Sequence, residues 1–335
     1  MRTTTSCFPR RTLRLACSTF ALAALLAGGL ASRSTAAAPS SAKKVPLMQA
    51  LPLPDQQVSF QRDGFELCRY YFGTTLRRPF IYPVMGPSGR SLTRMGHPHD
   101  PESHSHHYSV WISHADVDGL SFWEDRSKAR IVHQRIEQFA DADDESFLVA
   151  VNAWLNETNS KTILTERRAV RVQPLPNQEW LLVLDVELRA GTNAVTFGKS
   201  PFGLIGVRMA KTIGVNDGGG VLRNSEGQVG EPEIFWKHAR WVDYSGPITA
   251  AAIEGITLMD HPSNPNHPTG FHVRSDGWMG ASLTLDAART LQPGEALAVR
   301  YGLYVHSGQP SLDALNRRWE TFAKTQAGVP ALPKK

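Results

Sequence analysis

The chain has 335 residues, of which 41% are hydrophobic and 20% charged, and this composition is typical of a globular protein rather than a disordered or collagen-like one. Five of its 36 Lys and Arg residues lie within residues 1–38, which contain no Asp or Glu, so the rest of the chain carries 31 basic and 31 acidic residues. This balance gives no bulk electrostatic reason to expect a nucleic acid or an anionic membrane as partner.

Residues 1–38 have the pattern of an export signal. Arg10 and Arg11 precede an apolar stretch at 15–31, and three alanines end the segment. We therefore expect this segment to be cleaved and the mature protein to be periplasmic or secreted. The sequence around the arginine pair resembles a twin-arginine signal, and the twin-arginine and general secretory routes both stay open. No later stretch reaches 18 consecutive apolar residues, so we expect no transmembrane segment in the mature chain.

Four prolines fall within residues 39–57, and they predict a Pro-rich linker or entry arm before the folded domain. From 58 to 330 the sequence repeats one texture, in which short runs of β-branched and aromatic residues are separated by Gly, Pro, Asn and Asp. Within 180–189 every second residue is apolar, as expected for a strand with one face on a core.

Residues 311–325 differ from this texture because they carry a helical pattern. Leu312, Leu315, Trp319 and Phe322 recur at helical spacing, and Ser311 precedes them as an N-cap. We predict a mainly β protein: a single large antiparallel β-sandwich or supersandwich domain over residues 58–330, with one C-terminal helix.

Histidine carries most of the chemistry visible in the sequence. Five of the twelve His residues fall within residues 97–107. Imidazole can act as a general acid or base near neutral pH, and on a strand His104 and His106 would share a face while His107 would point the other way. These three side chains could instead bind a single divalent metal ion such as Zn, Cu or Fe. A solvated loop whose His residues bond locally is the structural alternative.

A second cluster occupies a proline-rich, stiff loop and the run after it, at residues 260–274. It contains His261 and ends in His272 and Arg274, which alternate and would share a face on a strand. Arg274 could bind a carboxylate, a phosphate or sugar hydroxyls through its planar fork. A binding site and a structural turn are equally compatible with this pattern, and the sequence does not say whether the two His clusters meet in space.

Several short motifs follow one another in a specific order between about residues 65 and 306. They are Tyr71-Phe72-Gly73, Arg78 to Pro83, Gly86 to Gly89, the His block ending in His106-His107, Val117 to Trp123, Phe202 to Arg208, Trp241 to Gly246, His261 to Pro265, and His272-Val273-Arg274. In this order they resemble the bacterial family named "methane oxygenase PmoA", whose function is unknown. The resemblance implies a galactose-mutarotase type of β supersandwich and a carbohydrate-linked role, with a sugar or glycoside as ligand.

Our first hypothesis is therefore an exported enzyme that acts on a sugar or glycoside as an epimerase, lyase or hydrolase, with imidazole as acid and base. The expected catalytic residues are His106, His107 and His272. The expected ligand-binding residues are Arg208, Arg274, Trp123 and His261.

Two alternatives remain. The family usually has Asp-His-Pro-His-His where this chain has residues 102–107, and the lost carboxylate favours a non-catalytic glycan-binding or structural protein of the same fold. A metal-dependent oxygenase rests only on the His block and the family's name, and it is the least supported of the three.

Overall fold

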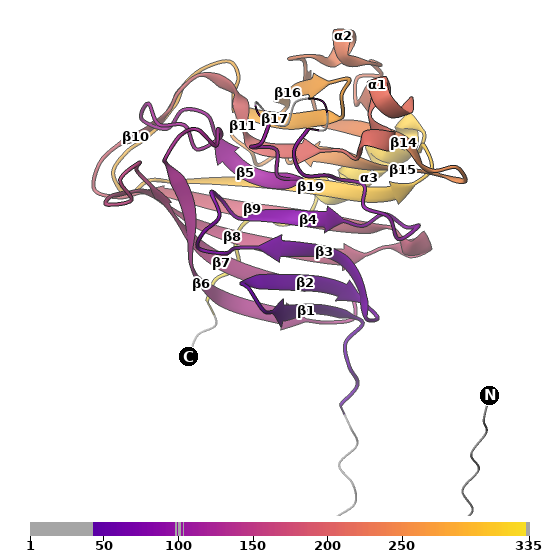
Figure 1. Cartoon of the computed structure of the whole chain (residues 1–335), viewed down its shortest axis with the longest axis horizontal. Helices are drawn as coiled ribbons and strands as arrows, with labels where there is room; N and C mark the ends of the chain where they lie inside the picture. Colours follow the sequence, from indigo (N-terminus) through magenta and orange to yellow (C-terminus); the bar gives the residue numbers. More distant parts are fainter. Residues whose placement is uncertain (1–42, 98, 100–101, 103, 333–335) are drawn as a thin grey trace, which may run out of the picture. The chain divides into compact units, whose positions relative to one another are not determined.

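A computed structural model of the chain describes residues 43–97, 99, 102 and 104–332 (Figure 1). The expected export signal at 1–38 lies outside these residues. All the strands and helices given below fall within the unit that begins at Val45. Among the described residues, no helix has the length and apolar character needed to cross a membrane.

Most strands belong to two large antiparallel sheets. The first has nine strands in the order β1 (Met48–Leu53), β2 (Gln57–Arg62), β3 (Phe65–Tyr71), β4 (Phe80–Val84), β5 (Val110–His114), β11 (Ser200–Arg208), β17 (Trp278–Thr284), β16 (Thr269–Arg274) and β13 (His238–Ala239). The second has eight strands in the order β12 (Val221–Asn224), β14 (Trp241–Thr249), β15 (Ala252–Asp260), β19 (Ala296–Ser307), β9 (Trp180–Ala190), β8 (Thr162–Pro174), β7 (Ser146–Leu155) and β6 (Arg130–Asp141).

The remaining elements are small except for one helix. A two-stranded ribbon joins β10 (Val195–Phe197) to β18 (Arg289–Leu291). The short helices are η1 (Pro176–Gln178), η2 (Lys211–Ile213), α1 (Val215–Gly218) and α2 (Glu231–Ile234). Helix α3 (Leu312–Ala323) begins after Ser311, whose hydroxyl accepts a hydrogen bond from the Ala314 backbone amide as an N-cap. The predicted mainly β class, antiparallel sheets and C-terminal helix are confirmed.

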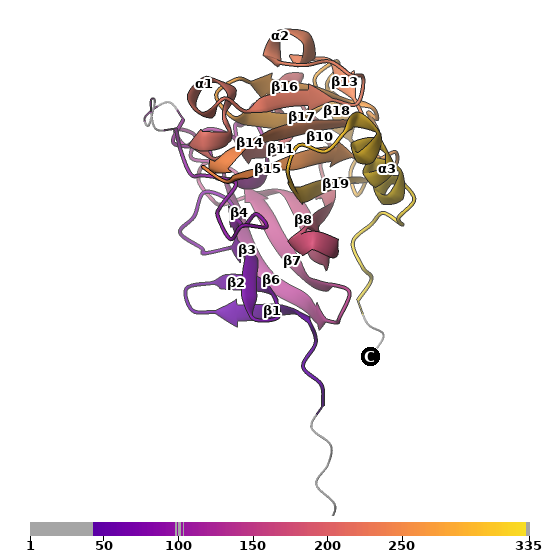
Figure 2. The same cartoon turned by 90° about the vertical axis from the view of Figure 1, so that its right-hand side faces the viewer.

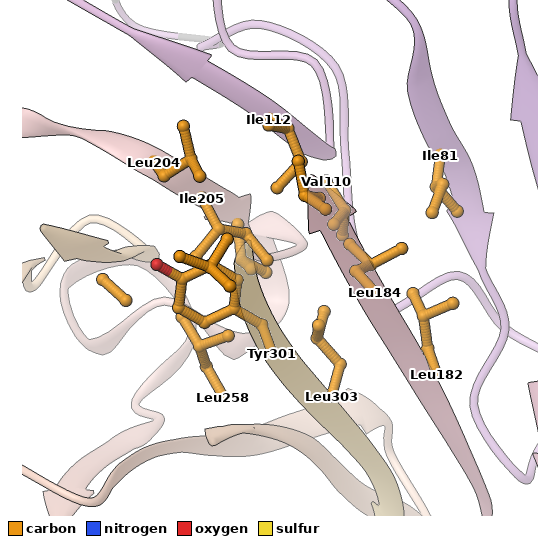
Figure 3. Close-up of a cluster of buried hydrophobic side chains, with 14 of the residues drawn as sticks. Ile81, Val110, Ile112, Leu182, Leu184, Leu204, Ile205, Leu258, Tyr301 and Leu303 are labelled. Atoms are coloured by element: carbon orange, nitrogen blue, oxygen red, sulfur yellow. The ribbon is translucent and has the colours of Figure 1, made fainter. Parts of the chain in front are cut away.

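The main core forms where the two sheets face each other. Figure 3 shows Val110 and Ile112 of the nine-stranded sheet in the same cluster as Leu182 and Leu184 of the eight-stranded sheet. Burial of each such side chain contributes about 1.5–3 kcal/mol relative to exposure. The alternation predicted over 180–189 produces this arrangement, because every second residue of β9 enters the core.

The other face of the eight-stranded sheet is covered by α3 (Figure 2). Leu315 and Phe322 of the helix pack against Leu181 and Val183 of β9. The helical spacing of apolar residues therefore serves to seal the outer face of this sheet.

The predicted linker at 39–57 needs a correction, because β1 lies inside it and pairs with β2. Pro52 lies within β1, at the edge of the nine-stranded sheet. An edge strand tolerates proline because one side of it needs no ladder hydrogen bond. The sheet therefore begins ten residues before the predicted domain boundary at 58.

A buried ionic network ties four elements of the eight-stranded sheet together at Asp243. The carboxylate accepts hydrogen bonds from His306 Nε2 at 2.8 Å and Thr257 Oγ1 at 2.8 Å on one oxygen. Its other oxygen accepts from Arg223 Nη2 at 2.6 Å and Ser245 Oγ at 2.7 Å. Burial opposes ionisation of Asp243, but the charge and hydrogen bond of His306, followed by those of Arg223, outweigh it and lower the pKa of Asp243 to about 2.

We expect Asp243→Asn to lower the free energy of unfolding by about 3–5 kcal/mol at pH 7, because it removes the buried carboxylate that accepts from Arg223, Ser245, Thr257 and His306. The contribution of Asp243 is present above its unfolded pKa, near 3.9, and is lost as pH falls toward 2. Urea unfolding at pH 7 and below pH 3 measures this difference. Asp55→Asn, at an exposed turn, is the control, and an equal effect of both substitutions at pH 7 would contradict this account.

Candidate functional site

The site lies on the face of the nine-stranded sheet that points away from the main core. Val110 and Ile112 of β5 join that core, whereas Trp111 between them belongs to a separate aromatic cluster with Phe80, Trp123 and Trp278. The alternation of a strand thus gives the sheet a second, largely aromatic face.

Strand register brings distant parts of the sequence into one row on this face. Trp111 of β5 pairs with Gly206 of β11, which pairs with Gly280 of β17, which pairs with His272 of β16. Two glycines therefore lie between the tryptophan and the histidine and leave space above the sheet for side chains from neighbouring positions.

A second row follows two residues further along the same strands. Arg208 of β11 pairs with Trp278 of β17, which pairs with Arg274 of β16. The expected alternation of His272 and Arg274 on a strand is confirmed, and the register adds Arg208 to the same patch.

A cavity of about 190 Å³ opens over these two rows. Its lining residues include members of the His block, of the second cluster and of the loops that follow β5 and β16. Its described lining residues are His104, His106, His107, Ala115, Trp123, Glu124, Phe202, Arg208, His272, Arg274, Asp276 and Trp278. The two His clusters therefore meet in space, at His106 and His107 on one side and His272 on the other.

Trp278 is the central aromatic residue of the site. Its ring centroid lies 5.3 Å from that of Trp111, 5.7 Å from that of Trp123 and 5.2 Å from that of His107. The His107 ring lies nearly parallel to Trp278, at 14°, and also stacks on Trp111. Aromatic packing thus fixes the orientation of His107 at the cavity wall.

His272 is fixed in one tautomer by a hydrogen bond. Trp278 Nε1 donates to His272 Nδ1 at 2.9 Å, and an indole can only donate. The neutral imidazole therefore carries its proton on Nε2. Burial, followed by the charge of Arg274, lowers the pKa of His272 to about 4, so the ring is neutral at pH 7 and Nε2 is a hydrogen-bond donor.

His107 is 6% exposed, and its Nδ1 has no hydrogen-bond partner among the described residues. Burial, followed by the neighbouring His106, holds the pKa of His107 well below its usual range. A protonated ring here would be a buried cation between two indoles and beside other cationic groups. His107 is therefore neutral at pH 7.

His106 is half-buried at the mouth of the cavity, with its ring centroid 4.5 Å from that of His107. Burial, followed by the charge of Arg78, lowers the pKa of His106 to about 4. No hydrogen bond engages its ring within the described part of the chain. His106 is thus a neutral imidazole with a free nitrogen lone pair at pH 7.

Arg78 connects the loop that carries His106 to the loop that carries Trp123. It is 1% exposed and donates to the backbone oxygens of Phe122 at 3.1 Å, Trp123 at 2.8 Å and His106 at 3.1 Å. Because these carbonyls belong to both loops, Arg78 sets the position of His106 relative to Trp123.

Arg208 is fully buried and forms an ion pair with Asp276. Its Nη1 donates to Asp276 Oδ1 at 2.8 Å, while His97 Nε2 lies 3.0 Å from Asp276 Oδ2. Burial opposes ionisation of Asp276, but its bonds with Arg208 and His97 outweigh that effect and lower the pKa of Asp276. Arg208 Nε and Nη2 have no hydrogen-bond partner among the described residues.

Comparison with known families assigns the chain to a family but does not assign it an activity. The sequence profile of a family of unknown function, DUF6807, matches residues 57–320, which is most of the chain. The chain belongs to this family. The match carries neither an activity nor the methane oxygenase name. Comparison with curated proteins finds no match.

Solved structures give distant likenesses. A polysaccharide lyase (BACCELL_00875) is 12% identical with a TM-score of 0.30, over 84% of this chain and 35% of the lyase. A GalM/aldose epimerase homologue from C. elegans is 7% identical with a TM-score of 0.30, over 78% of this chain and 99% of the homologue. A TPR-domain protein from Parabacteroides distasonis is 11% identical with a TM-score of 0.26, over 87% of this chain and 56% of that protein. This chain spans about a third of the lyase. Likenesses with such low TM-scores assign no activity to this chain.

The described residues do not form the metal site considered for His104, His106 and His107. No group of three His, Cys, Asp or Glu side chains in the described part of the chain is arranged to hold a metal ion. The three rings pack on each other with centroids 4.5 to 6.0 Å apart, and His107 is confined between two indoles.

His261 lies outside the lining of this cavity, so the structure does not bring it together with the other expected ligand-binding residues. Its Nδ1 lies 2.8 Å from Ser263 Oγ and its Nε2 lies 3.2 Å from the Thr325 backbone oxygen. Its ring packs edge-on against Phe322 of α3. His261 therefore anchors the loop after β15 to the helix and its C-terminal end.

The cavity is also lined by Asp276, Trp278, Phe202 and Glu124, which are not among the site residues expected from the sequence. For two of these residues the sequence carries a signal. Asp276 and Trp278 continue the spacing of two residues that begins with His272 and Arg274, through the turn and into the next strand. Glu124 follows the predicted Trp123 directly, but nothing in its sequence context marked it.

Gly206→Ala tests how closely the aromatic residues approach the sheet. A Cβ at residue 206 would lie 2.5 Å from Trp278 Cη2 and 2.9 Å from Trp111 Cζ2. We expect this substitution to lower the free energy of unfolding by about 1–3 kcal/mol and to change the tryptophan fluorescence, because it displaces one indole. Gly191→Ala is the control, since a Cβ there meets no atom within 4 Å. Equal stability of the two variants would contradict the predicted close packing.

Because several histidines are buried, we expect the free energy of unfolding to fall in mild acid. Burial lowers the pKa of His114 to about 4, as burial and then Arg274 do for His272, whereas an unfolded His titrates near 6.5. Between pH 6.5 and 4 the unfolded state binds more protons, so the free energy of unfolding decreases as pH falls through this window. We expect about 3 kcal/mol per histidine over the window.

Urea unfolding at pH 7, 5.5 and 4 measures this slope. His272→Asn places an amide oxygen where Nδ1 accepts from Trp278 and removes the titrating ring, so it should flatten the slope by one histidine. Gln134→Asn, at an exposed position without a titrating ring, should leave the slope unchanged. A wild-type slope in His272→Asn would show that His272 is not held neutral by the fold.

Proposed function

We propose that this protein is an exported enzyme that binds a sugar or glycoside on the aromatic face of its nine-stranded sheet and acts on it by imidazole acid/base chemistry. One observation carries the proposal: His106, His107 and His272, which come from two segments far apart in the sequence, converge on a cavity walled by indole and phenyl rings. Aromatic rings suit the apolar faces of sugars, and convergent polar groups suit their hydroxyls.

The size of the cavity restricts the ligand. Its volume of about 190 Å³ is below the range of about 300–1,000 Å³ typical of pockets for drug-sized molecules. It therefore fits one small ring. Phe202 is exposed and packs beside the buried Trp123, with ring centroids 6.0 Å apart, so the Phe202 ring offers a stacking surface for the ring of the ligand.

The histidines take different roles because their surroundings differ. His106 is neutral, faces the cavity mouth and keeps a free lone pair, so it accepts a proton from the ligand as general base. His272 donates from Nε2, because Trp278 occupies Nδ1, and it stabilises negative charge that develops on a ligand oxygen. His107 packs against the ring of His106, and its own ring is stacked between two indoles.

This division refines the expectation that His272 is the acid/base partner of His106. A ring whose Nδ1 accepts from an indole cannot take a second proton without losing that hydrogen bond. His272 is thus an oxygen-binding donor in the proposed reaction. Proton removal by His106 is a step that an epimerase, a lyase and a hydrolase can share, so all three reaction classes remain within the proposal.

We expect His106→Ala to lower turnover by about 100-fold or more, the range typical of a lost general base, with a smaller change in ligand affinity. Sugars and glycosides are screened first with the wild-type protein, with product detected by NMR. His238→Ala, at an exposed ring, is the control and should keep wild-type turnover. Undiminished turnover by His106→Ala would overturn its role, and saturable binding without product would favour the non-catalytic glycan-binding alternative.

A further inference from the structure

We infer that Arg208 is the receptor for a carboxylate and that the ligand is therefore an acidic sugar, a uronic acid or a glycoside of one. This inference rests on the proposed function, because it names the substrate class of the same cavity. It begins from the chemistry of a single buried guanidinium.

Arg208 uses one side of its guanidinium for the protein and leaves the other without a partner. The side chain is 0% exposed and lines the cavity. Nη1 is bound to Asp276, whereas Nε and Nη2 have no hydrogen-bond partner among the described residues. Nε and Nη2 lie on the same edge of a guanidinium, and this edge donates two parallel hydrogen bonds to a carboxylate.

No other arginine in the described part of the chain has two buried side-chain nitrogens without hydrogen-bond partners. Arg168, Arg223, Arg289 and Arg300 each have one such nitrogen. Buried donors without partners cost free energy, so the arrangement is stabilised when an acceptor with two oxygens arrives.

Asp276 fixes the direction of this edge. The carboxylate is bound by Arg208 on one oxygen and by His97 on the other. The backbone oxygen of Asp276 also accepts from Arg94 Nη2 at 3.1 Å. With Nη1 held in this way, the guanidinium plane is set before a ligand arrives, and a carboxylate gains affinity from that preorganisation.

The local charge also favours an anion. Arg94 lies close to Arg208, and its hydrogen bonds go to the backbone oxygens of Met209, Gly96 and Asp276 and not to a carboxylate. Burial, followed by the charge of Arg208, lowers the pKa of Arg94 to about 10, so it remains charged at pH 7. A ligand carboxylate at Arg208 adds negative charge beside these two guanidiniums.

The geometry of the cavity places the sugar next to this carboxylate. Arg208 and Arg274 flank Trp278 in one row of the sheet, and His272 lies in the adjacent row. A sugar ring held at the aromatic wall can direct a carboxylate at Arg208 while its hydroxyls reach His272 and Arg274. The neutral imidazoles add no negative charge, and the carboxylates of the lining are Glu124 and Asp276, of which Asp276 is bound to Arg208.

The decisive test compares acids with their esters on the wild-type protein. D-glucuronate and D-galacturonate are each titrated against the corresponding methyl ester, with binding measured by calorimetry at pH 7. The ester keeps the ring and removes the charge. We expect the acids to bind about 10- to 100-fold more tightly, the range for a charge-assisted hydrogen-bond pair.

A variant tests the residue itself. Arg208→Lys keeps the charge and removes the fork, so we expect the acid to lose about 10-fold or more in affinity while the ester is unchanged. Arg189→Lys, at an exposed position outside the cavity lining, is the control. Thermal unfolding checks that Arg208→Lys folds, and if it does not, the acid–ester comparison on the wild-type protein decides.

The outcomes separate this inference from the proposed function. Tighter binding of acids than esters, lost in Arg208→Lys, supports the inference. Esters or neutral sugars that bind as well as acids overturn it and leave the proposed function standing. Acid preference without turnover of any uronate or uronoside supports the carboxylate receptor and contradicts the enzyme. If neither acids nor esters bind, the inference is overturned.

Discussion

The contact between Trp278 and the bare backbone of Gly206 is the constraint on which the site depends. A Cβ on Gly206 would come within 2.5 Å of the indole, so the ring lies flat against the sheet only because residue 206 has no side chain. From that position Trp278 donates to His272, stacks on His107 and contacts Trp111 and Trp123. One indole thus sets the tautomer of one histidine and the ring plane of another.

The fold handles buried charge in two contrasting ways. In the eight-stranded sheet, Asp243 is surrounded by four hydrogen bonds, and its partners leave its two oxygens fully engaged. In the nine-stranded sheet, Arg208 is equally buried, yet one edge of its guanidinium lacks a partner among the described residues. The first arrangement stabilises the fold. The second has a free-energy cost that an acceptor bound in the cavity offsets, which is why the cavity, and not the network at Asp243, is the candidate site.

Much of the fold could be predicted from local patterns. The alternation over 180–189 and the helical spacing over 311–325 each reflect one element packing on one core, and both predictions are confirmed. The prolines at 39–57 predict a linker or arm, whereas the structure has strand β1 there, because an edge strand tolerates Pro52. A local sequence pattern does not give the position of a strand within the sheet, and that position determines whether the strand tolerates proline.

The candidate site was predictable only in its parts. His272 and Arg274 could be placed on one face because alternation is local, and Arg208 entered through a motif resemblance. Their meeting with His106 and His107 depends on the pairing of β5, β11 and the β16–β17 hairpin, which come from distant parts of the sequence. His261 shared a loop with the second cluster but faces α3 instead. Membership of a loop does not determine which way its side chains point.

The electrostatics of the cavity connect its two unusual features. The histidines are neutral because burial and nearby cationic groups disfavour imidazolium, and Arg208 is one of these groups for His107. The same Arg208 has two buried donors without partners among the described residues. In the proposed complex, a ligand carboxylate bound at Arg208 accepts from these donors and offsets the positive charge that acts on His107. The charge that binds the ligand therefore also changes the electrostatics of an imidazole at the cavity wall.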